Sequence, residues 1–224
     1  MMTKLSTQPR ESGACAMCSA LVREVAHSWN EPVHESENFV VMTSLGSLVE
    51  GWLLIVPRAH ALSAAALPTV LLDELHSVKA QVREMLTVAY GPVSFFEHGP
   101  SECHHLTGCG VDHAHVHAVP GIHDLLGAAF PLLPPGAKFR PGDINDCREA
   151  IAKGLDYLYL EQPNGDPWIA TARSFGSQTF RKAIAARLGL PDKYDWKVFP
   201  ELRNIDLTKT RLGGSCAQQE AAVA

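Results

Sequence analysis

Apolar and polar residues follow distinct patterns along the first half of the chain, and these patterns predict its strands and helices. Apolar runs at 52–56 and 93–98 are typical of buried strands. Apolar residues recur at helical spacing from about 68 to 90, which predicts the longest helix. Strict alternation from 111 to 120 predicts another strand. Two short strands are predicted at 32–37 and 38–43.

The second half has shorter and weaker patterns. Residues 121–142 are rich in Gly and Pro and are typical of a connector, after which Asp143 can cap a short helix. Two runs around a Pro-Asn-Gly-Asp turn predict a hairpin, 156–161 with 168–171. Ser177 is a candidate N-cap for a helix that reaches about residue 188. Periodicity is weak from 191 to 212, and we expect a flexible tail from 213.

Composition and charge exclude several classes of protein. The 224 residues are 46% hydrophobic, which is enough for one sizeable core. A net charge of −5 with scattered Lys and Arg argues against a nucleic-acid surface. No apolar run is as long as a membrane span, and the polar N-terminus does not look like a signal peptide. We therefore expect a cytoplasmic protein with reduced cysteines, bound neither to membranes nor to nucleic acid.

The alternating stretch carries three histidines at every second position. On a strand, His113, His115 and His117 share one face, with about 6.6 Å between successive Cα atoms. The plain interpretation is a solvated polar face. Imidazole, however, is the side chain suited to metal binding, nucleophilic attack and proton transfer near neutral pH. The alternation therefore predicts one site that contains all three rings.

Cysteines offer a second kind of chemistry. Cys15 and Cys18 form a C-x-x-C pair, which can supply two thiolates to a metal or act as a redox dithiol, and a helix is predicted after it. Two incidental cysteines are the alternative. A rival cluster lies at 103–109, but adjacent histidines on a loop converge poorly on one ion. Its members are Cys103, His104, His105 and Cys109.

The order of the motifs resembles the histidine triad family of nucleotide hydrolases and transferases, which act at the α-phosphate. The likeness rests on Pro57-Arg58-Ala59-His60, Phe96-Glu97-His98-Gly99 and the glycine-flanked histidine strand, and it covers about residues 15–120. It implies an α+β fold with an antiparallel sheet of about five strands, a long helix and usually a homodimer. We therefore expect a catalytic domain at 14–122, an extension at 123–212 packed on it, and flexible tails at 1–13 and 213–224.

The resemblance also implies roles for single residues. His115 is expected to attack the α-phosphorus of a nucleotide conjugate and to form a nucleotidyl-histidine intermediate, with His117 in contact with the phosphate. Further residues are expected around the nucleotide: Gly108 and Gly110 through their backbone N–H groups, Ser44 at the ribose, and Glu97, protonated or paired with His98, near the phosphate. The substrate class comprises dinucleoside polyphosphates, nucleoside phosphoramidates and similar conjugates.

Zinc is a further implication of the resemblance. Cys15, Cys18, His60 and His113 match the ligand positions of zinc-containing members. Four protein ligands leave no open position, so the expected role of the zinc is structural.

The extension and the overall function leave alternatives open. The helix after Ser177 carries Gln178 and Arg181, which could bind a distal phosphate; the alternative is an amphipathic helix with a solvated basic side. Two other functions compete with the nucleotidyl-histidine enzyme. One is a zinc-dependent hydrolase in which His113 and His115 hold a catalytic metal. The other is a non-catalytic nucleotide-binding protein.

Overall fold

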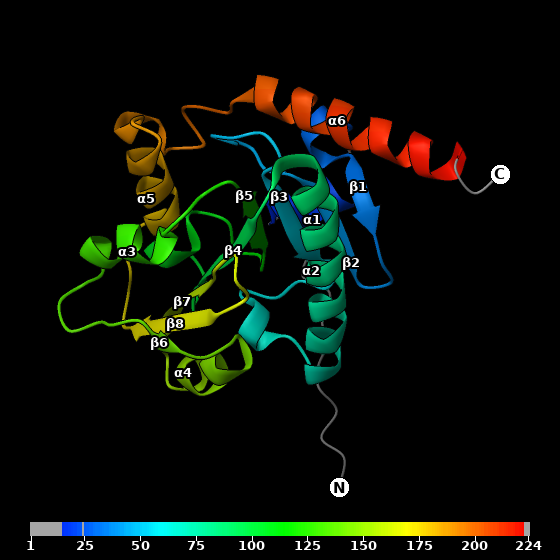
Figure 1. Ribbon diagram of the computed structural model, residues 1–224. Coiled ribbons are helices and arrows are strands. Elements are labelled where there is room, and N and C mark those ends of the chain that lie inside the picture. Colours follow the sequence, from blue (N-terminus) through cyan, green and yellow to red (C-terminus); the bar gives the residue numbers. More distant parts are fainter. Residues whose placement is uncertain (1–14, 24, 222–224) are drawn as a thin grey trace, which may run out of the picture.

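The computed structural model describes residues 15–23 and 25–221, so the leader predicted at 1–13 lies outside the described residues. The fold is α+β, as predicted, and eight strands form one antiparallel sheet in the order β1-β2-β3-β5-β4-β7-β8-β6 (Figure 1). The strands are β1 Pro32–Glu35, β2 Phe39–Thr43, β3 Leu53–Pro57, β4 Val93–Gly99, β5 Val116–Pro120, β6 Arg140–Pro141, β7 Asp156–Glu161 and β8 Pro167–Ala172.

Helices cover both faces of this sheet. They are α1 Ala16–Leu21, α2 Thr69–Tyr90, α3 Leu125–Ala129, α4 Arg148–Ala152, α5 Thr179–Arg187 and α6 Leu202–Ala221. Short 3-10 helices lie at Ser28–Asn30, Ala64–Ala66, Leu106–Gly108, Phe130–Leu132, Asn145–Cys147 and Pro191–Lys193. Among the described residues, none of these helices combines the length and apolarity needed to cross a membrane.

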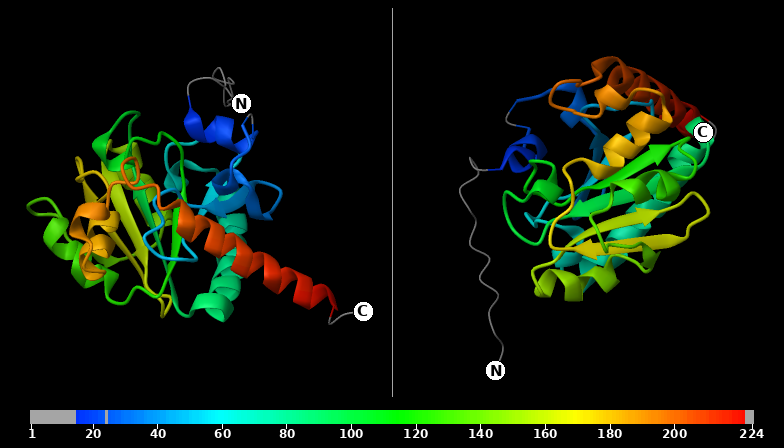
Figure 2. Two further views of the ribbon diagram at one scale, coloured as in Figure 1. Left: turned by 90° about the horizontal axis from the view of Figure 1, so that it is seen from above. Right: turned by 90° about the vertical axis from the view of Figure 1, so that its left-hand side faces the viewer.

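Strand alternation places one large core on each face of the sheet, and a third, smaller cluster lies under α1. Phe95 and Val116 pack against α2 on one face of the sheet, whereas Phe96 and Val119 pack against α3 and α5 on the other (Figure 1). Helix α6 runs along the outside of the molecule, in contact with β1, β2 and one end of α2 (Figures 1 and 2). His117 points to the α5 side, away from α2, because its neighbours Val116 and Ala118 on β5 belong to the core on the α2 side.

The predicted extension continues the sheet instead of forming a separate layer. Strand β7 pairs antiparallel with β4, with Phe96 opposite Leu160, and β8 and β6 follow it. The expected count of about five strands therefore applies only to β1–β5. The sheet runs uninterrupted across the expected domain boundary at 122/123, because the hairpin satisfies the backbone groups along the open side of β4.

Several expected boundaries differ from the structure. Strand β5 begins at Val116, so His113 and His115 precede it. Ser177 is not the N-cap of α5: Gln178 takes that position with a φ of 59° and without a side-chain cap. A flexible tail was predicted from residue 213, but within the described residues this segment is helical and forms the end of α6, up to Ala221.

Candidate functional site

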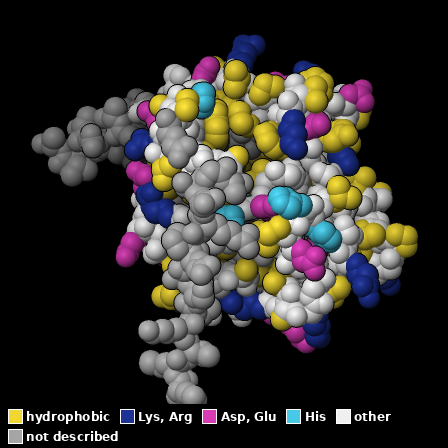
Figure 3. Space-filling view, turned by 180° about the vertical axis from the view of Figure 1, so that it is seen from behind, with side chains coloured by type: hydrophobic (Ala, Val, Ile, Leu, Met, Phe, Trp, Pro, Cys, Tyr) yellow, Lys and Arg dark blue, Asp and Glu magenta, His cyan; other side chains and the backbone are white. Residues whose placement is uncertain are grey.

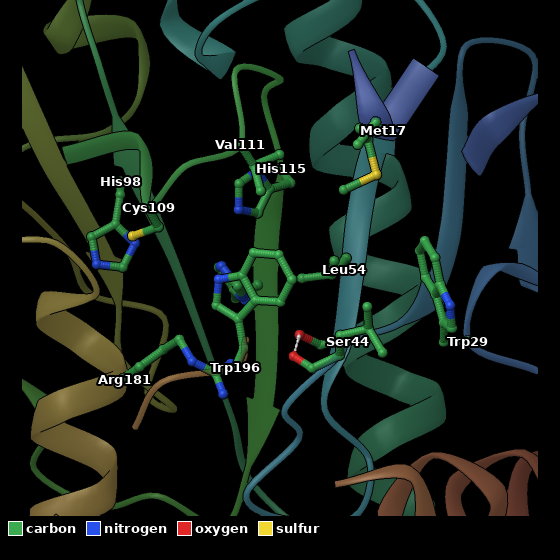
Figure 4. Close-up of a pocket in the computed structure, with 13 residues that line it drawn as sticks. Met17, Trp29, Ser44, Leu54, His98, Cys109, Val111, His115, Arg181 and Trp196 are labelled. Carbon is green, nitrogen blue, oxygen red and sulfur yellow. Dashed lines mark hydrogen bonds between the residues drawn. The ribbon is translucent and has the colours of Figure 1, made fainter. Parts of the chain in front are cut away.

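A cavity of about 190 Å³ lies on the α5 side of the sheet (Figure 4). His98 from β4 and His117 from β5 line it, together with His115 just before β5. Arg181 comes from α5, and Ser44 follows β2. Segments far apart in the sequence thus bring three imidazoles and one guanidinium to the same space.

His115 is held in one tautomer by the backbone. Its Nδ1–H donates to the carbonyl oxygen of His113 at 2.7 Å, so Nε2 keeps a lone pair. Burial lowers the pKa of the ring below its usual value, and the nearby Arg181 acts in the same direction. The imidazole is therefore neutral at pH 7, and its free nitrogen is a nucleophile.

His117 has the complementary tautomer. The indole Nε1–H of Trp52 donates to its Nδ1 at 3.0 Å, which leaves the ring proton on Nε2. The ring stacks on Phe96 at 4.4 Å between centroids, and its centroid lies 4.9 Å from that of His115. Burial places the pKa of His117 well below its usual value. One ring thus presents a lone pair while its neighbour presents an N–H donor.

Arg181 is a buried cation without a carboxylate partner among the described residues. Only 2% of it is exposed; its Nε donates to the Tyr194 carbonyl at 2.9 Å and its Nη2 donates to the Gly46 carbonyl. The guanidinium also lies 4.7 Å from the Trp52 ring centroid. Burial lowers the pKa of Arg181 to about 10, which still leaves it charged at pH 7. Asp195 is close enough to interact with this charge but makes no ion pair with it, and a buried cation without an ion pair favours an anionic ligand.

His98 completes the polar side of the cavity. Its Nε2 accepts from the backbone N–H of Phe180 at 3.2 Å, in the first turn of α5. Burial lowers the pKa of His98 to about 3, so the ring is neutral. Its Nδ1 has no hydrogen-bond partner among the described residues. Helix α5 is thus docked on the site through its N-terminal end.

A second cluster lies beside the cavity and has the chemistry of a metal site. One ligand atom from each of Cys15, Cys18, His60 and His113 lies within 4.8 Å of all the others. The Sγ atoms of Cys15 and Cys18 lie 3.6 and 3.5 Å from Nδ1 of His113. A tetrahedral zinc with ordinary bond lengths separates a sulfur and a nitrogen ligand by about 3.6 Å. The donor set and the spacing therefore fit a closed Cys₂His₂ site.

The ring of His113 is oriented for this cluster by a backbone carbonyl. Its Nε2–H donates to the Pro57 oxygen at 2.9 Å, so Nδ1 faces the thiols as a lone pair. His115 is not a member of the cluster. Its Nδ1 is occupied by the His113 carbonyl, and the Cys₂His₂ cluster and His115 are therefore separate features.

Comparison with known proteins places this chain beside histidine triad proteins. No protein-family model matches it. The chain resembles the histidine triad family. Three solved members illustrate the likeness: a Zn-bound protein from Mycobacterium smegmatis (17% identity, 64% of this chain and 96% of that one, TM-score 0.43), a hypothetical nucleotide-binding protein from Sulfolobus tokodaii (24%, 47% and 68%, 0.39) and a HIT family hydrolase from Clostridium thermocellum (20%, 50% and 94%, 0.40).

A curated relative is much longer than this chain. Zinc finger CCCH domain-containing protein 64 of Arabidopsis thaliana is 27% identical over 180 residues, which cover 74% of this chain. The match covers only 29% of the relative's own length.

The histidine triad resemblance misplaced Glu97. Its carboxylate accepts from the Ala64 N–H at 2.8 Å and from the Tyr157 hydroxyl, on the α2 side of the sheet. Alternation along β4 makes this unavoidable, because His98 faces the cavity and its neighbour must face the other side. Burial raises the pKa of Glu97 to about 7. Glu97 therefore neither faces a phosphate in the cavity nor pairs with His98.

Other predicted contacts also differ from the structure. The side chain of Gln178 is committed to Asp195 at 3.1 Å and to the Trp196 N–H at 3.4 Å, so it holds a loop and does not face the cavity. The Gly108 N–H donates to the His105 carbonyl at 3.1 Å and is not free for a phosphate. Gly110 has a φ of +78° beside Lys197 and does not line the cavity.

The rival cluster at 103–109 does not converge, as expected. His104 pairs with Asp112 at 2.8 Å and His105 with Asp156 at 2.5 Å, while Cys109 accepts from the Gln178 N–H at 3.1 Å. The only group of metal-ligating side chains found among the described residues is the Cys₂His₂ cluster.

Sequence reasoning missed the aromatic side chains of the site. Trp29 and Trp196 line the cavity, and Trp52 orients His117 from beneath it. Trp52 belongs to an apolar run that predicts only a buried strand, and Trp196 lies in a segment with weak periodicity. No local pattern distinguishes a tryptophan that lines a ligand site from one that fills a core.

Proposed function

We propose that this protein cleaves nucleotide conjugates at the α-phosphate through a nucleotidyl-histidine intermediate on His115. The observation that carries the proposal is the 2.7 Å hydrogen bond from Nδ1 of His115 to the His113 carbonyl, which keeps the Nε2 lone pair available in a cavity that also contains a buried cation. The reaction class is that of a nucleotide hydrolase or nucleotidyltransferase.

In the first step, Nε2 of His115 forms a bond to the α-phosphorus. The bond from phosphorus to the leaving group breaks, and the leaving group departs with the electron pair. A leaving phosphate needs no added proton, whereas an amine takes one from water. The positive charge that develops on the ring is stabilised by the His113 carbonyl, which accepts from Nδ1.

In the second step, the oxygen of a water or of another acceptor bonds to phosphorus. The phosphorus–nitrogen bond breaks, its electron pair returns to Nε2 of His115, and the acceptor's proton passes to solvent. His117 assists both steps, because Trp52 fixes its proton on Nε2, where it can donate to a phosphate oxygen.

We assign the binding of phosphate oxygens to Arg181 and the surroundings of the ribose to Ser44 and His98. Arg181 has the charge and lacks a carboxylate partner among the described side chains. The hydroxyl of Ser44 lines the cavity and donates to the Leu45 carbonyl at 3.1 Å, which leaves its oxygen able to accept.

We also propose that the Cys₂His₂ cluster holds a structural zinc. When bound, the ion supplies a cross-link between α1 and the residue before the nucleophile, and no catalytic chemistry. Cys15 and Cys18 would then fix the N-terminal wall of the cavity, while His113 would fix the carbonyl that orients His115.

Two alternatives make different predictions. A metal-activated water would require His115 to join the metal ligands, but Nδ1 of His115 is bonded to a carbonyl and its ring is outside the cluster. A non-catalytic binding protein would bind nucleotides without turnover. The homodimer also remains a prediction; strand β4 is paired on both sides, so a dimer would use another surface.

Trapping of the intermediate tests the proposal. The purified protein is incubated with a dinucleoside polyphosphate or a nucleoside phosphoramidate, quenched at alkaline pH and weighed as an intact chain. We expect a nucleotidyl adduct that maps to His115, absent from His115→Asn and present in His123→Asn, which changes an exposed histidine. His115→Asn should keep its metal. An active protein with no adduct, or loss of metal in His115→Asn, would contradict the proposal.

A further inference from the structure

Two tryptophans from opposite ends of the described chain line the cavity. Trp29 lies in the 3-10 helix Ser28–Asn30, and Trp196 lies in the segment after α5. In Figure 4 the two indoles stand apart, with Leu54 and Ser44 between them in that view. Both are partly buried. The ring of Trp29 stacks with that of His27 at 6.1 Å between centroids, and Nζ of Lys197 lies 5.6 Å from the centroid of the Trp196 ring, so a ligand would use the other face of each indole.

The surroundings of these two rings are apolar. Met17, Leu54 and Val111 complete this part of the cavity wall. The polar side chain of Ser44 also lines the cavity, and its hydroxyl already donates to the Leu45 carbonyl at 3.1 Å. Among the described side chains in this part of the wall, none is an amide, carboxylate or guanidinium that could form paired hydrogen bonds with the edge of a base.

Arg181, His115 and His117 line the same cavity and make one part of it cationic and nucleophilic. Trp196 lies beside Arg181, because both side chains approach Gly46, whereas Trp29 lies beyond Leu54 in the view of Figure 4. A ligand that fits the whole cavity therefore carries an anionic group beside Arg181 and a flat apolar group beside the indoles. A nucleoside monophosphate unit has this distribution, with its phosphate beside Arg181 and its base beside the indoles.

We infer that Trp29 and Trp196 hold the base by stacking alone, and that the site accepts purine and pyrimidine nucleotides alike. The inference rests on the proposed function for the position of the phosphate. Every base has a π-face, so stacking on aromatic side chains tolerates different bases, whereas hydrogen bonds to base edges discriminate between them. The recognised feature is the flat ring, and the substrate class is set by the phosphate and the aromatic ring together.

Trp196 is held in place by the segment that carries it. The Trp196 N–H donates to Gln178, and the Gly46 N–H donates to the Pro200 carbonyl at 2.8 Å. A Cβ built on Gly46 would lie 2.6 Å from Cβ of Trp196, so the loop after β2 and this segment are in close contact. Arg181 joins the same two segments through the carbonyls of Gly46 and Tyr194. The second aromatic wall is therefore part of the folded extension.

Binding of product-like nucleotides to the full chain tests the inference. Equilibrium dialysis compares adenosine, guanosine and uridine 5′-monophosphate with ribose 5-phosphate, which has no base. We expect the three nucleotides to bind within about tenfold of one another and ribose 5-phosphate to bind at least roughly 30-fold more weakly, since stacking of a base contributes from about fivefold to 150-fold.

Variants locate the effect. Trp196→Ala should weaken nucleotide binding roughly 10- to 100-fold and leave ribose 5-phosphate within threefold, while Trp196→Phe should keep most of the affinity. Trp168→Phe, on β8 away from the cavity, is the matched control and should change nothing. If Trp196→Ala does not fold, as judged by its urea unfolding curve, Trp29→Ala makes the same comparison at the other indole.

The outcomes separate this inference from the proposed function. Three results would each overturn the inference that Trp29 and Trp196 hold the base by stacking. They are equal binding of ribose 5-phosphate, unchanged nucleotide affinity in the tryptophan variants, and a preference above about 50-fold for one base. An adduct on His115 in the same preparation would show that the proposed function survives that failure. If no nucleotide binds and no adduct forms, both proposals fall.

Discussion

The carbonyl of His113 accepts a 2.7 Å hydrogen bond from Nδ1 of His115, while the ring of His113 faces the thiols of Cys15 and Cys18. One residue therefore contributes its side chain to the Cys₂His₂ cluster and its backbone carbonyl to the orientation of His115. The ring is fixed from the other side by the Pro57 carbonyl at 2.9 Å. A loss of order in the cluster should for this reason reach His115 directly.

Cys18→Ser tests this connection. We expect the metal content to fall from about one per chain to near zero, because a hydroxyl is a poor zinc ligand, and activity to fall roughly 10- to 100-fold. Metal analysis, activity and thermal unfolding are measured on one preparation, with the exposed Cys103→Ser as the control. Full activity in a metal-free Cys18→Ser protein would contradict the connection.

Trp52→Phe tests the role of the indole that donates a hydrogen bond to His117. Trp52 is fully buried, and its Nε1–H is the group that fixes the tautomer of His117. Without that donor, either nitrogen of His117 can carry the proton, so we expect kcat to fall about fivefold to tenfold with KM little changed. The smaller ring should also lower the free energy of unfolding by about 1–3 kcal/mol. The ring nitrogen chemical shifts of His117 show which nitrogen carries the proton. Unchanged shifts in Trp52→Phe would mean that Trp52 does not fix the tautomer of His117.

The elements around His115 and His117 were predictable because the spacing of apolar residues along the sequence matches their secondary structure. The apolar run at 52–56 and the long amphipathic helix lie within one residue of β3 and α2. The pairing of β7 with β4 was not predictable. The sequence of each strand indicates only that it is buried, and does not indicate which strand lies beside it. The extent of α6 was missed because its residues 213–221 lack a strong apolar stripe.

Some residues of the candidate site were predicted correctly and others were not, for similar reasons. Cys15, Cys18, His60 and His113 converge as the resemblance implied, since the spacing of ligand residues carries information about a metal site. Glu97 was misplaced because the resemblance was applied without the alternation of β4, which sends it to the opposite face from His98. Trp196 could not be assigned, because its position depends on how the segment after α5 folds back over Gly46.

Arg181→Met tests the buried cation. The substitution keeps an apolar stem but removes the charge and the bonds to the Tyr194 and Gly46 carbonyls. We expect affinity for nucleoside monophosphates to fall by about 30-fold or more and the free energy of unfolding to fall by about 1–3 kcal/mol. Arg181→Lys should recover part of the affinity through its charge. The solvated Arg187 provides the matched control, Arg187→Met, at the other end of α5. Unchanged affinity in Arg181→Met would place the phosphate elsewhere.

His98 makes the stability of the fold depend on pH. Burial lowers its pKa from 6.5 to about 3 in the folded protein. Below pH 6.5 the unfolded chain binds a proton at this position and the folded protein does not, until the pH approaches 3. The contribution of the neutral ring is therefore complete above pH 6.5 and is lost progressively as the pH falls. Between pH 7.5 and pH 5 this single group should lower the free energy of unfolding by about 2 kcal/mol.

His98→Gln isolates this contribution from all other titrating groups, the metal ligands included. The variant should be less stable than the parent at pH 7.5, because the packing against Phe96 and Phe180 is lost. Its stability should nevertheless fall less steeply on acidification, by about 1.4 kcal/mol per pH unit between pH 6 and 4. Urea unfolding at several pH values measures both slopes. His123→Gln should keep the parental slope, because that side chain is exposed to solvent in both states. Parallel curves for His98→Gln and the parent would mean that the buried ring does not resist protonation.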